Sequence, residues 1–275
     1  MNDMSSMLSE YQWFCIKILA CGLSASFKEN IMHATNGRLL GQRVIVLGAS
    51  SGIGLAVARE ALREQAEVLV VSSQISRVEK ALEYLGSKAQ GCALDLHDER
   101  AIERFFATAG EFDHLVYTAG DALTIGPLTG VDLTAARSVF DLRYWGALAA
   151  AKYGARHIRA GGSVTFTTGI ASVRPQTGWS LMSSVCGAVE ALTRALAVEL
   201  APLRVNAVSP GVLATNLWAD MPQAQREQLF ADVSESLLVG RVGSAEDVAA
   251  AYLFLMSSGY ATGQIHVVDG GALLI

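Results

Sequence analysis

The 275-residue chain has few cysteines and few charged side chains, and both shortages limit what it can be. Its four cysteines, Cys15, Cys21, Cys92 and Cys186, form no Cys-x-x-Cys pair and no histidine cluster at metal-ligand spacing. Neither a metal site nor a disulfide framework is predicted, and a reducing, cytoplasmic setting is the default expectation. The formal net charge of −5 gives no electrostatic reason to expect nucleic acid or a membrane as a partner.

Proline is also scarce, with 5 residues, whereas 51% of the chain is hydrophobic and 26 residues are glycine. This composition suits a buried parallel sheet and argues against disorder. The length fits one α/β domain with a short appendage.

Residues 1–41 are expected to be an N-terminal extension. The stretch from Tyr11 to Phe27 is mildly apolar but carries Lys17 in its middle, so it is too short and too interrupted to span a bilayer. It also lacks the basic start of a signal peptide. The extension is interpreted as an amphipathic segment or as the product of a start upstream of Met32, with a tail without function as the default.

Short β-branched runs alternate with helical spacing along the rest of the chain. Strands are predicted at Arg43–Leu47, Glu67–Val71, Gly91–Leu94, His114–Tyr117, Ser163–Thr167, Arg204–Val208 and Gln264–Val268. Helices are predicted at Ile53–Glu64, Arg77–Leu85, Ala101–Ala107, Asp132–Ala155, Ser180–Leu200 and Ala245–Met256. Because the strands are too apolar for one exposed face, helices should cover both faces of the sheet. The predicted fold is a single doubly wound α/β domain of Rossmann type over residues 42–275, with a seven-stranded parallel sheet.

A glycine-rich loop follows the first predicted strand, with the sequence Gly48-Ala49-Ser50-Ser51-Gly52-Ile53-Gly54. Glycines at this junction let the backbone turn tightly and approach a pyrophosphate, whose charge is met by free N–H groups at the start of the next helix. The position between a strand and a helix favours a dinucleotide site over an ordinary turn.

This loop resembles the TGxxxGIG sequence of the short-chain dehydrogenases/reductases, with Leu47 in place of the threonine. The resemblance continues through Ala188–Ala197, Arg204–Gly211 and Val267–Gly271 and so covers the chain from about residue 41 onward. It implies further cofactor contacts, to adenine from Asp95 and Leu96, and to the rest of the dinucleotide from Thr118, Ala119, Gly120, Pro210, Gly211, Val212 and Thr215.

The choice of cofactor is predicted from the end of the second strand. NAD-binding domains place an acidic residue there, which bonds the ribose hydroxyls and repels a 2′-phosphate. This chain has Ser72 and Ser73 instead, with Arg77 nearby. NADP is therefore favoured over NAD, and the alternative for Arg77 is a solvated residue in the first turn of a helix.

The catalytic residues typical of this family are absent. In the family a Tyr donates a proton, a Lys four residues later lowers the Tyr pKa, a Ser thirteen residues earlier holds the carbonyl oxygen, and an Asn fixes a water relay. The resemblance places these roles at Met182, Cys186, Gly169 and Arg143, and the chain has no Tyr-x-x-x-Lys sequence. Loss of the general acid costs carbonyl reduction about 10²–10⁴-fold.

Four residues remain as candidates for chemistry at this place: Arg143, Thr168, Trp179 and Cys186. Arg143 offers a planar fork for a carboxylate or phosphate, and an ion pair with Asp141 is its alternative. Trp179 offers a stacking wall or packs in the core. A thiol inside a helix, as at Cys186, is more often an inert buried group than a proton donor. Arg174 is expected beside Arg143 and Trp179.

Within the family, the pattern resembles a divergent branch without Tyr and Lys, the premalbrancheamide synthase-like reductases. Arg143 and Trp179 match that branch, but its catalytic Asp, three residues before the Trp, is replaced here by Gln176, which argues against cycloaddition. Uncharacterised bacterial oxidoreductases share the same pattern.

Three functions remain open. The favoured one is an NADP-dependent reductase of a small imine, iminium or carbonyl substrate. The alternatives are an isomerase or cyclase that acts by proximity and electrostatics, and a catalytically silent nucleotide-binding subunit.

Two surfaces complete the prediction. The segment from Asn216 to Val239 is expected to be an apolar loop over the substrate, with Trp218, Met221 and Leu229. A homodimer or homotetramer is expected from the resemblance, through a small-residue face at Ala147, Ala150, Ala151 and Gly154.

Overall fold

A computed structural model describes residues 37–275. The predicted extension lies almost entirely outside this range, but Leu39, its last apolar residue but one, is fully buried, and its N–H bonds the Glu64 carbonyl at 3.1 Å. The folded domain therefore includes at least this residue.

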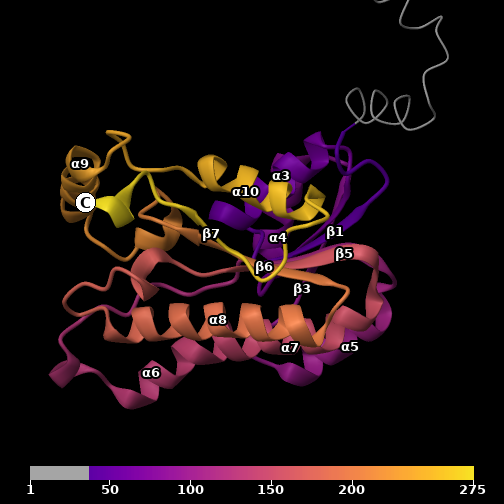
Figure 1. Cartoon of the computed structure of the whole chain (residues 1–275), viewed down its shortest axis with the longest axis horizontal. Coiled ribbons are helices and arrows are strands. Elements are labelled where there is room, and N and C mark those ends of the chain that lie inside the picture. Colours follow the sequence, from indigo (N-terminus) through magenta and orange to yellow (C-terminus); the bar gives the residue numbers. More distant parts are fainter. Residues whose placement is uncertain (1–36) are drawn as a thin grey trace, which may run out of the picture.

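Seven parallel strands form one sheet in the order β3-β2-β1-β4-β5-β6-β7 (Figure 1). They are β1 (Arg43–Leu47), β2 (Glu67–Ser72), β3 (Ala89–Ala93), β4 (Phe112–Tyr117), β5 (Ile158–Thr167), β6 (Arg204–Pro210) and β7 (Ile265–Val268). The strand order reverses between β1 and β4, which is where ligands bind in open α/β sheets. The predicted seven-stranded, doubly wound fold is confirmed.

Helices cover both faces of the sheet (Figure 1). On one face lie α3 (Gly52–Arg63), α4 (Ile75–Leu85) and α10 (Ala245–Ser257); on the other lie α5 (Glu99–Ala109), α6 (Leu133–Phe140), α7 (Ala147–Gly154) and α8 (Ser180–Glu199). Strand β1 shows why, because Val44 and Val46 pack into one core while Ile45 and Leu47 pack into the other. A strand with two buried faces needs no polar alternation.

The predicted helix Asp132–Ala155 is interrupted. Between α6 and α7 the backbone forms a π-helical turn, η2 (Asp141–Gly146). A π turn differs from an α-helix by its i→i+5 hydrogen bonds, and no proline between Leu133 and Gly154 marks the interruption in the sequence. The turn contains Arg143.

The small-residue face predicted to join two subunits is buried inside the domain. Ala150 and Ala151 are fully buried, and a methyl group added to Gly154 would lie 3.0 Å from the Phe106 ring. These residues let α7 approach α5 and the sheet closely, so they are not available to a second copy. The assignment of this face to an interface was wrong.

The segment after β6 also differs from the expected loop. It contains α9 (Gln223–Ser236), a helix without a buried residue, so no apolar stripe revealed it. Within residues 37–275, α8 alone is long and apolar enough to cross a membrane, but Val189, Leu192 and Leu196 of this helix lie in the core.

Candidate functional site

The glycine-rich loop is shaped by close backbone approach. Gly48 has φ +89°, and a methyl group added to it would lie 2.5 Å from the Ala119 nitrogen. A methyl group on Gly54 would lie 2.4 Å from Thr118 Oγ1 and 2.5 Å from the Gly48 carbonyl oxygen. Neither position has room for a side chain, so the loop after β1 and the loop after β4 are held in contact.

Helix α3 begins at this loop with its first N–H groups available. The N-cap residue is Ser51, and its side chain makes no capping hydrogen bond. The N-terminus of a helix without a side-chain cap offers N–H donors and a positive dipole end to an anion. Gly52 and Ile53, the first two helical residues, are only partly buried. The start of α3 can therefore hold a pyrophosphate.

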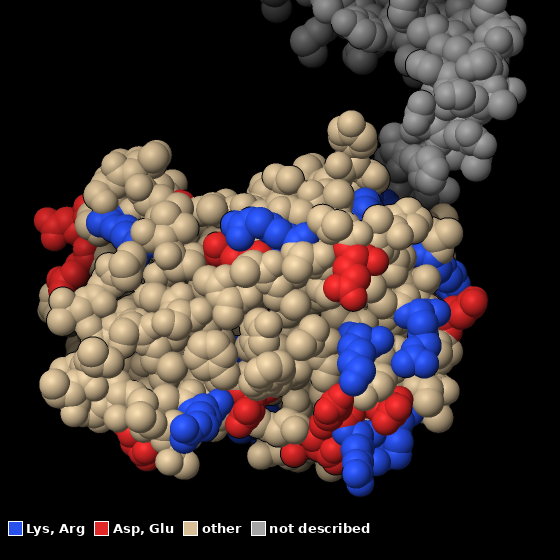
Figure 2. Space-filling model, turned by 60° about the horizontal axis from the view of Figure 1, so that its bottom comes forward, with Lys and Arg blue, Asp and Glu red and all other residues tan. Residues whose placement is uncertain are grey.

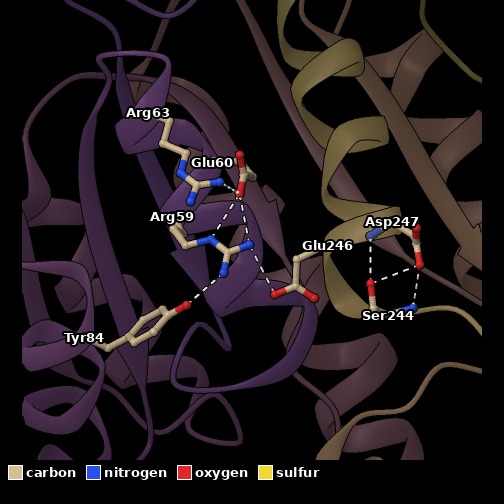
Figure 3. Close-up of polar contacts among 7 residues, drawn as sticks. All are labelled: Arg59, Glu60, Arg63, Tyr84, Ser244, Glu246 and Asp247. Carbon is tan, nitrogen blue, oxygen red and sulfur yellow. Dashed lines mark hydrogen bonds and ion pairs between the residues drawn. The ribbon is translucent and has the colours of Figure 1, made fainter.

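Arg59 links α3 to the neighbouring helices α4 and α10 (Figure 3). Arg59 Nη1 donates to the Tyr84 hydroxyl of α4 at 2.8 Å, and Nη2 lies 3.2 Å from Glu246 Oε1 of α10. Its ion pair with Glu60 completes the set. A cavity of about 230 Å³ extends from these side chains up to Gly52 and Thr215.

At the end of β2 the two serines predicted to meet the ribose differ in exposure. Ser72 is buried, and its Oγ lies 2.9 Å from Ser50 Oγ of the glycine-rich loop. Ser73 and Arg77 are exposed at the start of α4. The hydroxyl pair, the exposed Ser73 and the exposed Arg77 cation lie where the resemblance predicts that a ribose or its 2′-phosphate is bound.

The predicted adenine contacts lie after β3. Asp95 Oδ1 accepts from the His97 backbone N–H and is 3.0 Å from His97 Nδ1. These hydrogen bonds lower the pKa of Asp95, which keeps the carboxylate ionised. Leu96 is buried beside it.

The loops after β4 and β6 complete the cofactor side. Thr118 Oγ1 donates to the Leu47 carbonyl at 3.0 Å, which places Ala119 and Gly120 beside the glycine-rich loop. After β6, Pro210, Gly211 and Val212 lead to Thr215, whose Cβ lies 3.8 Å from a methyl group placed on Gly52. The structure thus brings Thr215 to the start of α3.

On the other side of the site, Arg143 extends from η2 towards these loops. Its Nη2 donates to the Asp121 carbonyl, and Nη1 lies 2.5 Å from where a Gly120 Cβ would be. Its Nε is buried and has no hydrogen-bond partner within residues 37–275. Burial lowers the pKa of Arg143, while the nearby Cys186 and Asp121 groups act in the opposite direction. A buried N–H without a partner points to a ligand or water that would accept from it.

Cys186 on α8 faces the space left by Gly169. A methyl group added to Gly169 would lie 3.4 Å from Cys186 Sγ. Burial raises the pKa of the Cys186 thiol, which Thr168 and Arg143 partly oppose, so the thiol stays protonated. Thr168 Oγ1 donates to the Cys186 carbonyl at 3.1 Å.

Glu190 belongs to the same group and was missed in the sequence. It is 7% exposed, and its Oε1 accepts from Ser172 Oγ and lies 3.4 Å from Thr168 Oγ1. The available signal was its spacing, because Glu190 lies four residues after Cys186 and therefore shares its helix face. In the sequence analysis Glu190 enters only as part of the stretch Ala188–Ala197 that resembles the family.

Met182, which the resemblance places at the family's tyrosine position, is 3% exposed. It packs with Val139 and Val185, and Leu123 and Tyr144 border this cluster. Its side chain therefore forms part of the wall between α6 and α8.

Trp179 and Arg174 lie near the start of α8. Trp179 is its half-buried N-cap residue, and its carbonyl accepts from the Ser183 N–H at 2.8 Å. Arg174 instead donates to the Ala272 carbonyl in the C-terminal turn, so its guanidinium already has a partner there.

The segment predicted to cover the substrate, residues 216–239, is fastened at both ends. Trp218 is 5% exposed, and its Nε1 donates to the Leu213 carbonyl at 2.9 Å. Leu213 pairs with Gly243 in an isolated bridge, directly before the capping box of Ser244 and Asp247 (Figure 3). Helix α9 is thus carried on a loop with a fixed base.

Comparison with known proteins gives concordant matches. Residues 48–272 match the family model described as Enoyl-(Acyl carrier protein) reductase. The protein named Short-chain dehydrogenase/reductase ATR9, from Stachybotrys chlorohalonatus (strain IBT 40285), is 38% identical over 249 residues, which cover 85% of this chain and 98% of that protein.

Two solved structures are similar over nearly their whole length. A small-chain dehydrogenase in complex with NADPH has a TM-score of 0.76 and 39% identity, over 85% of this chain and 99% of that one. The MalC Reductase/Diels-Alderase from Malbranchea aurantiaca has a TM-score of 0.81 and 31% identity, over 87% of this chain and 99% of that one.

Proposed function

The chain belongs to the short-chain dehydrogenase/reductase family, and on that premise we propose that it is an NADP-dependent reductase of small imine or iminium compounds, or of activated carbonyls. The cofactor preference is supported by Ser72, Ser73 and Arg77, and by the similar dehydrogenase that was solved with NADPH. NADPH, when bound, supplies a hydride.

The observation that carries the substrate class is the composition of the reaction side. Met182, Gly169 and Cys186 provide no phenol, no hydroxyl and no ammonium at the three positions that the resemblance assigns to carbonyl reduction. Hydride addition to an iminium carbon gives a neutral amine and needs no proton from the protein. A carbonyl oxygen, in contrast, develops negative charge that must be stabilised and protonated.

Arg143 is proposed to bind a carbonyl oxygen or an anionic group elsewhere in the substrate. Its buried Nε–H lacks an acceptor, and its Nη2 is anchored on the Asp121 carbonyl. A guanidinium held in this way is pre-oriented for an incoming acceptor. Trp179 is proposed to provide an apolar wall and Cys186 a neutral thiol, with Thr168 orienting the Cys186 turn.

The proposal is tested with purified protein, NADPH or NADH, and three probes: a cyclic imine, the matching N-alkyl iminium salt and the cyclic ketone of the same ring size, each with and without a ring carboxylate. We expect NADPH oxidation with the imine or iminium probe and little with the ketone. Arg143→Ala should lose about 2–5 kcal/mol of transition-state stabilisation for a probe with a carboxylate. Arg143→Lys, which keeps the charge, is the matched control. Binding of NADPH without oxidation by any probe would contradict a reductase and favour a silent nucleotide-binding subunit.

A second candidate is an isomerase or cyclase. It is favoured by the similarity to MalC, described as a reductase and Diels-Alderase. The resemblance of Arg143 and Trp179 to that branch of the family points the same way. Gln176, three residues before Trp179, lacks a carboxylate, which argues against it. Product formation from a polyene substrate without NADPH consumption would support this candidate.

Self-association is proposed through α8 in place of the buried small-residue face. Ala191, Ala195 and Val198 of α8 are exposed, with Val198 81% exposed. The surface turned forward in Figure 2 has few charged side chains across its middle. Light scattering at micromolar concentration tests this, and a monomer would contradict it.

A further inference from the structure

The hydroxyl group of Tyr117 holds the backbone turn that carries Arg143. Tyr117 ends β4 and is 2% exposed, and its hydroxyl donates to the Leu142 carbonyl at 2.6 Å. Leu142 lies in the π-helical turn η2, directly before Arg143. A buried phenol needs an acceptor, and a wide turn has carbonyls displaced from the α-helical pattern, so the pair satisfies both groups.

Gly146 makes this contact possible. A methyl group at Gly146 would lie 2.5 Å from the Tyr117 hydroxyl oxygen and 2.8 Å from the Leu96 carbonyl oxygen. The last residue of η2 therefore has to be glycine for the turn to rest on the tyrosine.

The end of β4 and the loop after it thus hold two successive residues of η2. Tyr117 bonds the Leu142 carbonyl, while Asp121, four residues later in the chain, accepts from Arg143 Nη2. Arg143 also lies against Gly120 on one side and near Cys186 on the other. Fixing the Leu142 backbone determines the direction in which the next side chain leaves the turn.

We propose that Tyr117 is a positioning residue for Arg143: its hydroxyl holds the π-helical turn η2 open and so directs the guanidinium into the site between Gly120 and Cys186. The positioning role does not depend on the proposed function; only the identity of the group that Arg143 binds does. The π turn, Tyr117 and Gly146 together then hold the Arg143 cation at the position that the resemblance assigns to the relay asparagine.

The test follows the position of the guanidinium without any turnover. Cys186 serves as the reporter, because the nearby Arg143 charge favours its thiolate and so raises its reactivity at a given pH. The rate of alkylation by iodoacetamide is measured from pH 6 to 10 by mass spectrometry of the peptide that contains Cys186. We expect Tyr117→Phe to move the profile to higher pH and to slow alkylation by roughly two- to tenfold at pH 8.

Two further variants separate positioning from general loosening. Arg143→Ala should shift the profile in the same direction, and adding Tyr117→Phe to it should cause no further shift. Tyr153→Phe is the matched control, because it removes a tyrosine hydroxyl bond of 2.8 Å, to Glu99 of α5, that involves no residue of η2. Its profile should match that of the unmodified protein.

Gly146→Ala provides a second way to separate the turn from Tyr117. It should shift the alkylation profile in the same direction, and NADPH binding checks that the fold is retained.

A profile unchanged by Tyr117→Phe, or an equal shift in Tyr153→Phe, overturns the positioning role. A profile unchanged by Arg143→Ala also overturns it, since the guanidinium then lies elsewhere. Failure of every probe to be reduced, with these shifts present, contradicts the proposed function alone.

Discussion

The cofactor side and the reaction side of the site are built from different parts of the chain. The cofactor side depends on backbone: Gly48 and Gly54 have no space for a side chain, and the N–H groups at the start of α3 are left available. The reaction side depends on side chains, and there Met182, Cys186 and Arg143 stand where the resemblance predicts the tyrosine, lysine and asparagine of an ordinary relative. A site made of backbone tolerates little variation, whereas a site made of side chains can change its chemistry on an unchanged fold.

The largest effect is expected from Gly54→Ala on the cofactor side. The added methyl group would lie 2.4 Å from Thr118 Oγ1 and 2.5 Å from the Gly48 carbonyl, so the loop must move. We expect NADPH affinity to fall by about a hundredfold or more, as a packed backbone is displaced at a cost of about 3 kcal/mol. Titration by NADPH fluorescence measures it. Gly187→Ala in α8, with no atom within 4 Å of the added group, is the matched control and should bind normally.

The stability of the folded domain, in contrast to cofactor binding, is expected to depend on pH through the buried His114. This side chain is 2% exposed, with Nδ1 2.9 Å from Ser163 Oγ and Nε2 2.7 Å from Gln42 Oε1. Burial, together with the charge of Arg204, lowers the pKa of His114 to about 4, although Asp113 acts in the opposite direction.

The sign of the effect follows from the unfolded chain, which takes up a proton on His114 at higher pH than the native state does. The free energy of unfolding should therefore be fully retained at pH 7 and fall as the pH drops from about 6.5 to about 4, by about 3 kcal/mol. Urea unfolding at several pH values measures this. His114→Gln should flatten the dependence, and an equally steep dependence in that variant would contradict the assignment.

A smaller effect is expected from Ser73→Asp, at the exposed end of β2. A carboxylate at this position repels a 2′-phosphate and accepts hydrogen bonds from the ribose hydroxyls of NADH. We expect the ratio of NADPH to NADH affinity to fall by about tenfold or more, which corresponds to about 1.4 kcal/mol. Ser73→Asn has nearly the same size without the charge and should leave the ratio almost unchanged. A ratio near one in the unmodified protein would overturn the assignment of NADP.

Much of the fold and of the glycine-rich loop could be predicted, because the spacing of apolar residues and of glycines reflects structure that is local in the sequence. The strand at Arg43–Leu47 was placed without error, since both of its faces are buried and its run is apolar throughout. The helix after it could be placed from Gly52, because the glycine-rich loop and the N-terminus of α3 are adjacent in sequence.

The rest depends on contacts between distant residues. Apolar spacing gave Ala150 and Gly154 one face, but only packing decides that this face meets Phe106 and not a second subunit. The bond from Tyr117 to Leu142 joins residues 25 positions apart, and the π turn that it stabilises leaves no periodic signal. Helix α9 carries no apolar stripe at all and was predicted as a loop.

The last prediction concerns the reaction side, where two substitutions together are expected to produce no efficient ketone reduction. Met182→Tyr with Cys186→Lys restores two residues typical of carbonyl reduction, yet we expect no efficient ketone reductase. Met182 is 3% exposed among Val139 and Val185, so a tyrosine there has an apolar wall to displace before its hydroxyl reaches the site. A lysine at 186 would lie beside the Arg143 guanidinium, and two cations in a partly buried site repel each other. Gly169 still offers no hydroxyl, and catalytic groups that act as a unit restore almost no activity when only some of them are present.

The measurement is steady-state NADPH oxidation with the cyclic ketone, with the triple variant that adds Gly169→Ser as the comparison. Ketone turnover by the double variant more than about a hundredfold above the unmodified protein would show that the reaction side is an ordinary site missing two residues.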